Sequence, residues 1–144
     1  MGYAQTDSRQ SRRHGVADSP VYRSASGIYF LEPAAVADIQ SRENAKGFDA
    51  PGATYPHKDG KGRCSFEALV DEHCSGDPVL IAMARMVRGA DFAEETNLTE
   101  ESAGIRTISQ GFPMVTDGDH ETLEKASFLY EALYASIRAR QQSS

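Results

Sequence analysis

Apolar positions recur with a helical period through the second half of the chain. Four segments show this spacing, and they begin near Ser65, at Asp77, at Thr99 and near Asp117 or Asp119. Apolar residues three or four positions apart lie on one face of a helix, so each segment predicts an amphipathic helix. In the last segment the spacing is 3, 4, 3, 4, which is typical of a helix that packs along another helix. It is formed by Leu123, Ala126, Tyr130, Leu133 and Ile137.

Local signals indicate where these helices begin and end. Asp77 followed by Pro78 is a strong start, because aspartate caps free N–H groups and proline suits the first helical position. Gly76 ends the helix before it. Gly111 and Pro113 end the third helix, since glycine favours a helix terminus and proline lacks the N–H that the next turn needs.

The first half of the chain predicts strands and one shorter helix. Residues 27–31 are apolar and aromatic, which is typical of a buried strand. Pro33 suits the first turn of a helix that we expect to run to about Asn44. Gly47, just beyond, is the residue that ends this helix. Residues 48–49 are a candidate for a second short strand.

Together these elements predict an α+β fold that is mostly α-helical, with a short N-terminal strand pair followed by four helices packed around one core. The length of 144 residues fits one domain, and a hydrophobic content of 40 % is enough for a core. We expect residues 1–26 to form a polar basic N-terminal arm and residues 27–142 to form the domain. The expected core residues are Phe66, Leu69, Met83, Val87, Ile105, Ile108, Leu123, Tyr130, Leu133 and Ile137.

Charge is spread unevenly along the chain, whose formal net charge is −6. Residues 1–23 contain four arginines and two aspartates, so the remainder carries the acidic excess. An acidic body argues against nucleic-acid binding by this domain, because phosphates require a basic face. The basic arm is interpreted as a solvated tail, or as a segment held by the body or by a neighbouring subunit of a homo-oligomer.

The sequence contains nothing that directs it into or across a membrane. No apolar run approaches the roughly 20 residues that a membrane-spanning helix needs, and residues 1–20 lack the apolar centre of a signal peptide. Cys64 and Cys74 would lie about 15 Å apart on one helix, which is too far for a disulfide. We therefore expect reduced thiols and a cytoplasmic location.

Candidate metal ligands gather around the glycine-rich loop at residues 57–67. His57, Cys64 and Glu67 lie in or just after this loop, and Asp91 ends the second of the four helices. Imidazole, thiolate and carboxylate are ligands of zinc and iron. We expect the His57 ring to point inward, toward Glu67 or Asp91. The alternative for each residue is an ordinary structural role: a surface histidine, a small core cysteine, a solvated glutamate and a capping or ion-paired aspartate.

Two arginines near these residues are candidates for binding an oxyanion. A guanidinium group suits tetrahedral oxyanions, so Arg63 and Arg88 are the side chains considered. The alternative, slightly favoured, is that they form structural ion pairs with Glu67 or Asp91.

Five short segments carry a family resemblance through their order and spacing. They are residues 48–52 (FDAPG), His57 with residues 62–67 (GRCSFE), residues 77–80 (DPVL), residues 87–91 (VRGAD) and residues 130–134 (YEALY). With these segments the chain resembles, from about Tyr29 to Ile137, the ChrB-type chromate-resistance domain of bacteria. The resemblance departs at its beginning, where family members usually have an Asp-Arg pair and then a Trp within an apolar helix. This chain has residues 19–23 (SPVYR) there, and it has no Trp.

The resemblance implies a role in oxyanion or metal stress, and it supplies no reaction. One hypothesis is an accessory or sensor domain of chromate resistance that binds a metal ion, such as zinc or iron, or a small oxyanion near residues 57–67. A second is a small metal-dependent enzyme that uses the same pocket, with His57 or Glu67 as ligand or general base. A third is a diverged scaffold that acts through protein–protein binding by its arm. The divergent beginning favours the first or the third.

Overall fold

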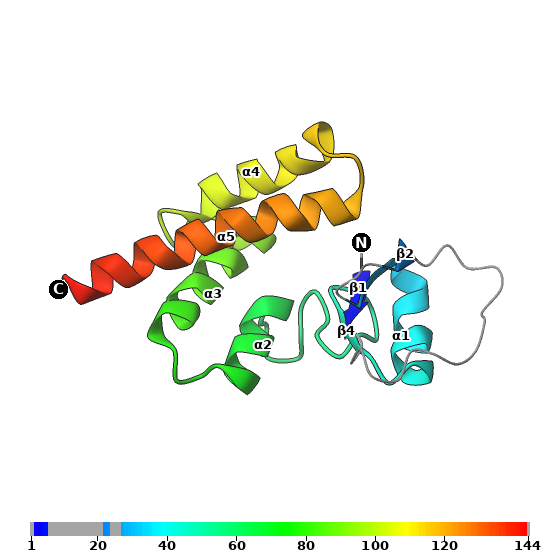
Figure 1. The fold of residues 1–144 in the computed structure, drawn as a ribbon. Helices are drawn as coiled ribbons and strands as arrows, with labels where there is room; N and C mark the ends of the chain where they lie inside the picture. Colours follow the sequence, from blue (N-terminus) through cyan, green and yellow to red (C-terminus); the bar gives the residue numbers. More distant parts are fainter. Residues whose placement is uncertain (1, 6–21, 24–26, 144) are drawn as a thin grey trace. The chain divides into compact units, whose positions relative to one another are not determined.

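The computed structural model describes residues 2–5, 22–23 and 27–143, and the chain divides into two compact units. The first unit spans Met1–Ser65 and the second spans Phe66–Ser144. Strands and one helix make up the first unit, whereas the second is helical, as the labels of Figure 1 show. The predicted class, an α+β fold that is mostly α-helical, is confirmed.

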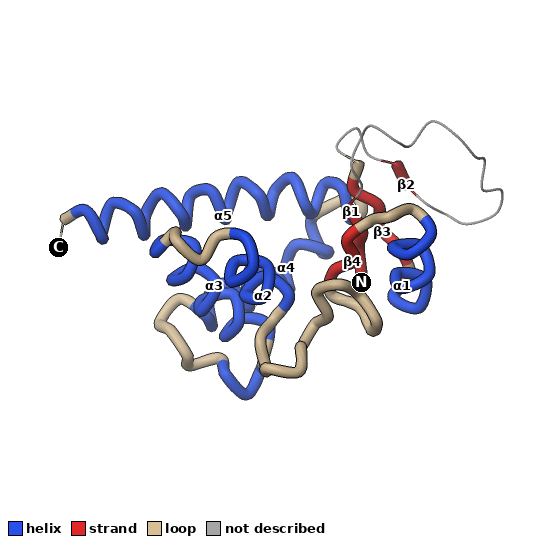
Figure 2. Tube along the Cα trace, turned by 90° about the horizontal axis from the view of Figure 1, so that it is seen from below, coloured by secondary structure: helices blue, strands red, loops and turns tan. Residues whose placement is uncertain are grey.

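A four-stranded sheet forms the first unit together with one helix (Figure 2). The strand order is β2-β3-β1-β4, and each neighbouring pair is antiparallel. The strands are β1 (Gly2–Gln5), β2 (Tyr22–Arg23), β3 (Ile28–Leu31) and β4 (Lys46–Phe48), and α1 (Pro33–Arg42) connects β3 to β4.

The sheet differs from the predicted strand pair because the N-terminal arm contributes to it. Strand β3 forms where expected, whereas β4 covers residues 46–48 where residues 48–49 were expected, and β1 lies between them and pairs with both. Ladder hydrogen bonds are made by the backbone, so a strand of only four residues leaves little trace in the sequence. The remainder of the expected arm, at residues 1, 6–21 and 24–26, lies outside the described residues.

A small cluster of buried residues holds α1 in the first unit. Leu31, Val36 and Ala50 are buried, and Tyr29 and Ile39 are among the half-buried residues packed against them. Val36 is fully buried. Its position on α1 explains why this helix forms although its sequence is only weakly amphipathic, because most helical stability comes from tertiary packing.

The four helices predicted for the second half of the chain are confirmed. Helix α2 begins at Ser65 and α3 at Pro78, as the sequence indicates, and α5 extends almost to the C-terminus. Helix α4 begins three residues later than expected and contains Pro113 in its last turn. The helices are α2 (Ser65–His73), α3 (Pro78–Asp91), α4 (Ser102–Val115) and α5 (Asp119–Gln142), with the short 3-10 helix η1 (Ala93–Glu95) after α3.

Helices α2 to α5 share one core. Its buried residues come mainly from α3, and Ile105 and Ile137 join them from α4 and α5. Phe66 of α2 packs against this cluster as a half-buried residue. The buried apolar residues of the described chain thus form two clusters, one in each unit, where the sequence predicted one core. The difference arises because α1 and the sheet bury their apolar side chains against each other.

One of the ten expected core residues, Ile108, is exposed. Its exposed fraction is 47 %, because the end of α4 and the start of α5 extend past α3 (Figure 1). Between Arg106 and Ser136, a stretch that the structure describes throughout, no residue is fully buried. The other nine expected residues are buried or half-buried. No helix among the described residues is long and apolar enough to cross a membrane.

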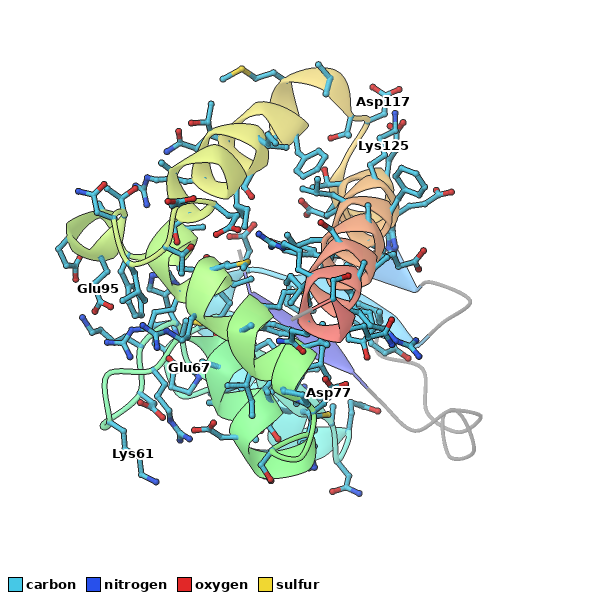
Figure 3. All side chains as sticks on the ribbon, turned by 90° about the vertical axis from the view of Figure 1, so that its left-hand side faces the viewer. Lys61, Glu67, Asp77, Glu95, Asp117 and Lys125 are labelled. Carbon is cyan, nitrogen blue, oxygen red and sulfur yellow. The ribbon has the colours of Figure 1, made fainter. Side chains whose placement is uncertain are left out.

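Asp77 caps α3 and also contacts α5 (Figure 3). Its carboxylate accepts hydrogen bonds from the backbone N–H groups of Val79 and Leu80, at 2.8 and 3.1 Å, and from the Tyr134 hydroxyl at 3.0 Å. The hydrogen bond from the Leu80 N–H is the main reason that the pKa of Asp77 lies below its ordinary value. The hydrogen bond from the Tyr134 hydroxyl lowers this pKa further. The same contact raises the pKa of Tyr134.

Asp77→Ala is expected to lower the Tm of the protein by a few degrees at neutral pH, since a helix cap and a contact to α5 are lost together. A carboxyl whose pKa is lower in the folded state contributes stability above its unfolded pKa, and this contribution disappears as the pH falls through the folded value. The Tm deficit of Asp77→Ala should therefore shrink on acidification. Asp77→Asn, which retains a capping oxygen, should lose less. Thermal denaturation of the three proteins against pH tests this, and a pH-independent deficit would contradict it.

Candidate functional site

The loop after β4 folds back on itself through two backbone hydrogen bonds. The Tyr55 N–H donates to the Gly47 carbonyl at 3.0 Å, and the Asp49 N–H donates to the Tyr55 carbonyl at 2.8 Å. The rings of Phe48 and Tyr55 stack with their centroids 5.0 Å apart. Asp49 has a φ of +53°, in the left-handed region that few residues other than glycine adopt. The position of Asp49 is therefore imposed by the loop around it.

Gln40 of α1 holds this loop with both ends of its amide. Its Nε2 donates to the Gly52 carbonyl at 2.7 Å. Its Oε1 accepts from the Gly47 N–H at 3.1 Å and from the N–H and hydroxyl of Thr54 at 2.9 and 3.0 Å. A Cβ added to Gly47 would lie 2.7 Å from a methyl carbon of Val36, so the close approach of helix and loop requires glycine there.

His57 contacts Asp49 at the end of this loop. The distance from His57 Nδ1 to Asp49 Oδ1 is 2.6 Å. The side chain of His57 is 57 % exposed and that of Asp49 is 39 % exposed, so the pair lies at the surface of its unit. An imidazole held by a carboxylate at a surface is a common arrangement in metal sites and in proton transfer.

The glycine-rich turn that follows is built on Asp59. Its carboxylate accepts hydrogen bonds from the N–H groups of Lys61 and Arg63, and it pairs with the Arg63 guanidinium at 2.7 Å. Burial would raise the pKa of Asp59, but the hydrogen bonds from Arg63 and Lys61 outweigh it and hold this pKa below its ordinary value. Gly62 has a φ of +77°, which its lack of a side chain permits. Arg63 is therefore engaged by a carboxylate.

Cys64 is fully buried where this turn ends. It forms an isolated antiparallel bridge with Lys58. The neighbouring Ser65, at the start of α2, donates from its hydroxyl to the Pro56 carbonyl at 3.0 Å. This environment agrees with the alternative interpretation of Cys64 as a small core residue, since free cysteine is among the most buried residue types.

Arg88 of α3 lies between two glutamates in the second unit (Figure 3). Its guanidinium donates twice to Glu95, from Nε at 2.6 Å and from Nη2 at 3.0 Å, and a third nitrogen lies 3.5 Å from Glu67. The hydrogen bonds to Glu95 are the main cause of the raised pKa of Arg88, and the charge of Glu67 adds to it. The expected ion pair of Arg88 with Glu67 is confirmed, with Glu95 as an additional and closer partner.

Asp91 ends α3 and is exposed. Its backbone carbonyl lies 3.4 Å from an Arg106 nitrogen that also donates to the Ala90 carbonyl at 2.8 Å. This contact helps to satisfy carbonyl groups at the end of the helix. The contact engages the backbone of Asp91.

The structure gives several of the predicted site residues charged neighbours within their own unit. In the first unit His57 contacts Asp49, and Arg63 contacts Asp59. In the second unit Glu67 contacts Arg88. Within the part of the chain that the structure describes, no group of three or more His, Cys, Asp or Glu side chains is placed to share a metal ion.

Asp49 is the candidate site residue that sequence reasoning missed. The sequence placed it in a short strand, whereas β4 ends at Phe48 and Asp49 begins the loop. A signal was present in its chemistry, because Asp is enriched several-fold among the few residues other than glycine that adopt left-handed backbone. The expected partner of His57 was Glu67 or Asp91, and the structure places Asp49 against its ring.

Comparison with known families supports the resemblance described above. The family model described as ChrB, C-terminal domain, matches residues 21–137, which is most of the chain. Neither the curated proteins nor the solved structures gave a match. The matched range includes residues 48–52, 57 and 62–67, so the Asp49–His57 pair and the turn built on Asp59 lie inside it. The chain therefore belongs to the ChrB C-terminal domain family, which is linked to chromate resistance.

Proposed function

We propose that this protein is an accessory or sensor domain of chromate resistance that binds a divalent metal ion, zinc or iron, through His57. The observation that carries the proposal is the 2.6 Å contact between His57 Nδ1 and Asp49 Oδ1. Histidines that ligate metals almost always donate their other ring N–H to a carboxylate, a carbonyl or water, and the contact fixes the ring orientation. Imidazole suits zinc and iron.

The residues present fit a metal ion in part. His57 supplies one donor at the surface of the first unit and Asp49 orients it, and water is available there to complete the coordination. Cys64 is fully buried, so the proposal does not use its thiolate. Glu67 is held by Arg88. We therefore expect binding weaker than that of a structural zinc site with four protein ligands.

A cation is supported better than an oxyanion because both candidate arginines are already paired. Arg63 contacts Asp59 at 2.7 Å, and Arg88 contacts Glu95 at 2.6 Å. An oxyanion would have to displace a carboxylate from a charge-assisted hydrogen bond, and such bonds are among the strongest in proteins. The acidic net charge of −6 also favours cations.

Calorimetric titration of the purified, untagged chain with Zn²⁺, and with Fe²⁺ under anaerobic conditions, tests the proposal. His57→Ala is expected to weaken binding at least 10-fold, since it removes the ligand itself. His73→Ala is the matched control, because this histidine is also about half exposed, at 50 %, and is expected to leave binding unchanged. Equal binding by wild type and His57→Ala would overturn the proposal.

Chromate titration of the same proteins separates the two kinds of ligand. Under the metal proposal, chromate binds no more tightly to the wild type than to Arg63→Gln. If chromate binds the wild type and His57→Ala equally and is lost in Arg63→Gln, the site is an oxyanion site and the metal proposal falls.

A further inference from the structure

We propose that two copies of this chain associate through the outer face of α5, with the two helices antiparallel. The outer face is the side of α5 opposite the core, and its residues are Phe128, Ala132, Ala135 and Ala139. This inference goes beyond the proposed function, because it concerns the helical unit and involves neither His57 nor a metal ion.

Helix α5 is long for the core that it meets. It has 24 residues and is the longest helix among the described residues (Figure 1). Within α5, which the structure describes throughout, Ile137 is the only buried residue. Most of the stability of a helix in a protein comes from packing of its apolar side chains. A further packing partner for α5 would supply what this single buried residue does not.

Apolar residues lie on both sides of α5. Its inner side packs on the core of the helical unit through Tyr130 and Leu133. On the outer face, Phe128 is 75 % exposed and the three alanines are exposed as well. A surface helix normally has one apolar stripe and a polar opposite face. The outer residues follow one another at spacings of 4, 3 and 4, which is the spacing of a seam between two helices.

The charges of α5 favour a second copy of the same chain in antiparallel orientation. Residues 119–131 contain four acidic side chains and one lysine, which sum to −3, and residues 132–142 contain two arginines, which sum to +2. In an antiparallel pair the acidic half of each helix lies along the basic half of the other, whereas a parallel pair would bring like charges together. One helix therefore supplies both complementary halves of the interface.

The side-chain sizes on the outer face indicate where the two copies cross. In a symmetric pair each contact occurs twice, once on each side of the two-fold axis. An axis between Ala132 and Ala135 places Phe128 of each copy opposite Ala139 of the other, where the small side chain leaves room for the ring. The two remaining alanines then meet at the centre, where they allow a close approach of the helices.

The same register gives a charge pair at each flank of the seam. It brings Glu131 of one copy next to Arg138 of the other, at the flanking positions where paired helices commonly form salt bridges. Both side chains are exposed. The charge of Arg138 also acts on Asp77 of its own chain, so each variant of Arg138 is checked for folding by thermal denaturation.

Sedimentation equilibrium of the full chain tests the inference, and we expect a dimer of two 15.7 kDa chains. Phe128→Gln is expected to weaken self-association at least about 10-fold, because burial of the ring is lost in both copies. Since Phe128 is 75 % exposed, its substitution should leave the fold intact. Met114→Gln is the matched control, because Met114 is an 83 % exposed apolar residue of α4 outside the outer face. It should leave the dimer unchanged.

Two charge reversals test the antiparallel register. Glu131→Arg turns one cross-axis pair into two arginines, and Arg138→Glu turns it into two glutamates, so each variant alone is expected to dimerise more weakly than the wild type. An equal mixture of the two variants should recover the dimer, because every pair across the axis again unites a guanidinium with a carboxylate. A merely destabilised fold would not be rescued by mixing.

Three results would overturn the inference. The first is a wild type that sediments as a monomer, and a lower Tm of Phe128→Gln would then show that the chain covers this face itself. The second is a dimer that Phe128→Gln leaves intact, since the interface would lie elsewhere. The third is a mixture of the two charge variants that associates no better than either variant alone.

Discussion

Gly89→Ala is expected to destabilise the helical unit by about 2 kcal/mol, although alanine is normally the better residue inside a helix by up to about 1 kcal/mol. Gly89 lies in the last turns of α3, facing the start of α4. A Cβ at this position would lie 2.7 Å from the Cβ of Ser102 and 2.9 Å from the carbonyl oxygen of Glu95. Neither neighbour is the flexible end of a side chain, so the two helices would have to separate.

Ser102 makes this separation costly because it anchors α4 to α3. It is fully buried, and its hydroxyl donates to the Met86 carbonyl at 3.1 Å. Moving α4 would break this hydrogen bond and open the core around Ile105, and a buried polar group that loses its partner costs about 1–3 kcal/mol.

Chemical denaturation followed by circular dichroism measures the effect, and Gly104→Ala is the matched control. Gly104 is a glycine inside α4 with no heavy atom within 4 Å of an added Cβ. Its substitution should therefore stabilise the protein by about 0.5–1 kcal/mol. If both variants are stabilised alike, the close contact between α3 and α4 is not present in solution.

The helices were predictable because their determinants are local. Asp77 and Pro78 predicted the start of α3 correctly, since capping and the proline preference depend only on adjacent residues. The apolar spacing predicted the face of α5 that packs on the core, including Tyr130 and Ile137. Ile108 has the same helical spacing and is exposed. Periodicity indicates which face is apolar, whereas burial depends on how far the neighbouring helix extends.

The place of β1 in the sheet and the partner of His57 were not predictable, because both depend on how distant parts of the chain fold together. β1 pairs with β3 and β4 across 23 to 45 residues of sequence, and its four residues do not indicate this pairing. The sequence identified His57 and expected Glu67 or Asp91 as its partner. Asp49 contacts His57 because its own backbone is left-handed, and this conformation is determined by the loop fold and not by residue type alone.

Among substitutions that keep the size of the side chain, a change at Gln40 should disturb this loop most. Gln40→Glu replaces the NH₂ group that donates to the Gly52 carbonyl at 2.7 Å with an oxygen. Two oxygens with lone pairs would then face each other, while the contacts with Gly47 and Thr54 remain available to the other oxygen. We expect the first unit to lose about 1–2 kcal/mol, the cost of one lost hydrogen bond and a partly desolvated charge.

Amide hydrogen exchange localises the effect to the loop. The N–H groups of Gly47 and Thr54, which donate to Gln40, should exchange roughly tenfold faster in Gln40→Glu, since about 1.4 kcal/mol corresponds to a factor of ten. The matched control is Gln110→Glu, the same change at an exposed position of α4. It should leave the exchange rates of the loop unchanged.

The loop defect of Gln40→Glu should depend on pH in a direction that distinguishes it from general destabilisation. A protonated carboxyl regains an O–H that can donate to the Gly52 carbonyl, so the fold favours the neutral form and raises the pKa of the introduced group above the ordinary value of about 4.3. The variant therefore recovers toward wild type as the pH falls through that raised pKa. Exchange rates of Gly47 and Thr54, measured as the ratio of variant to wild type between about pH 7 and pH 4, should approach one at the acidic end. A ratio that stays constant, or that grows on acidification, would show that Gln40 does not hold the loop by donating to Gly52.

Because the same loop fixes Asp49 against His57, Zn²⁺ binding by Gln40→Glu should weaken at neutral pH as well.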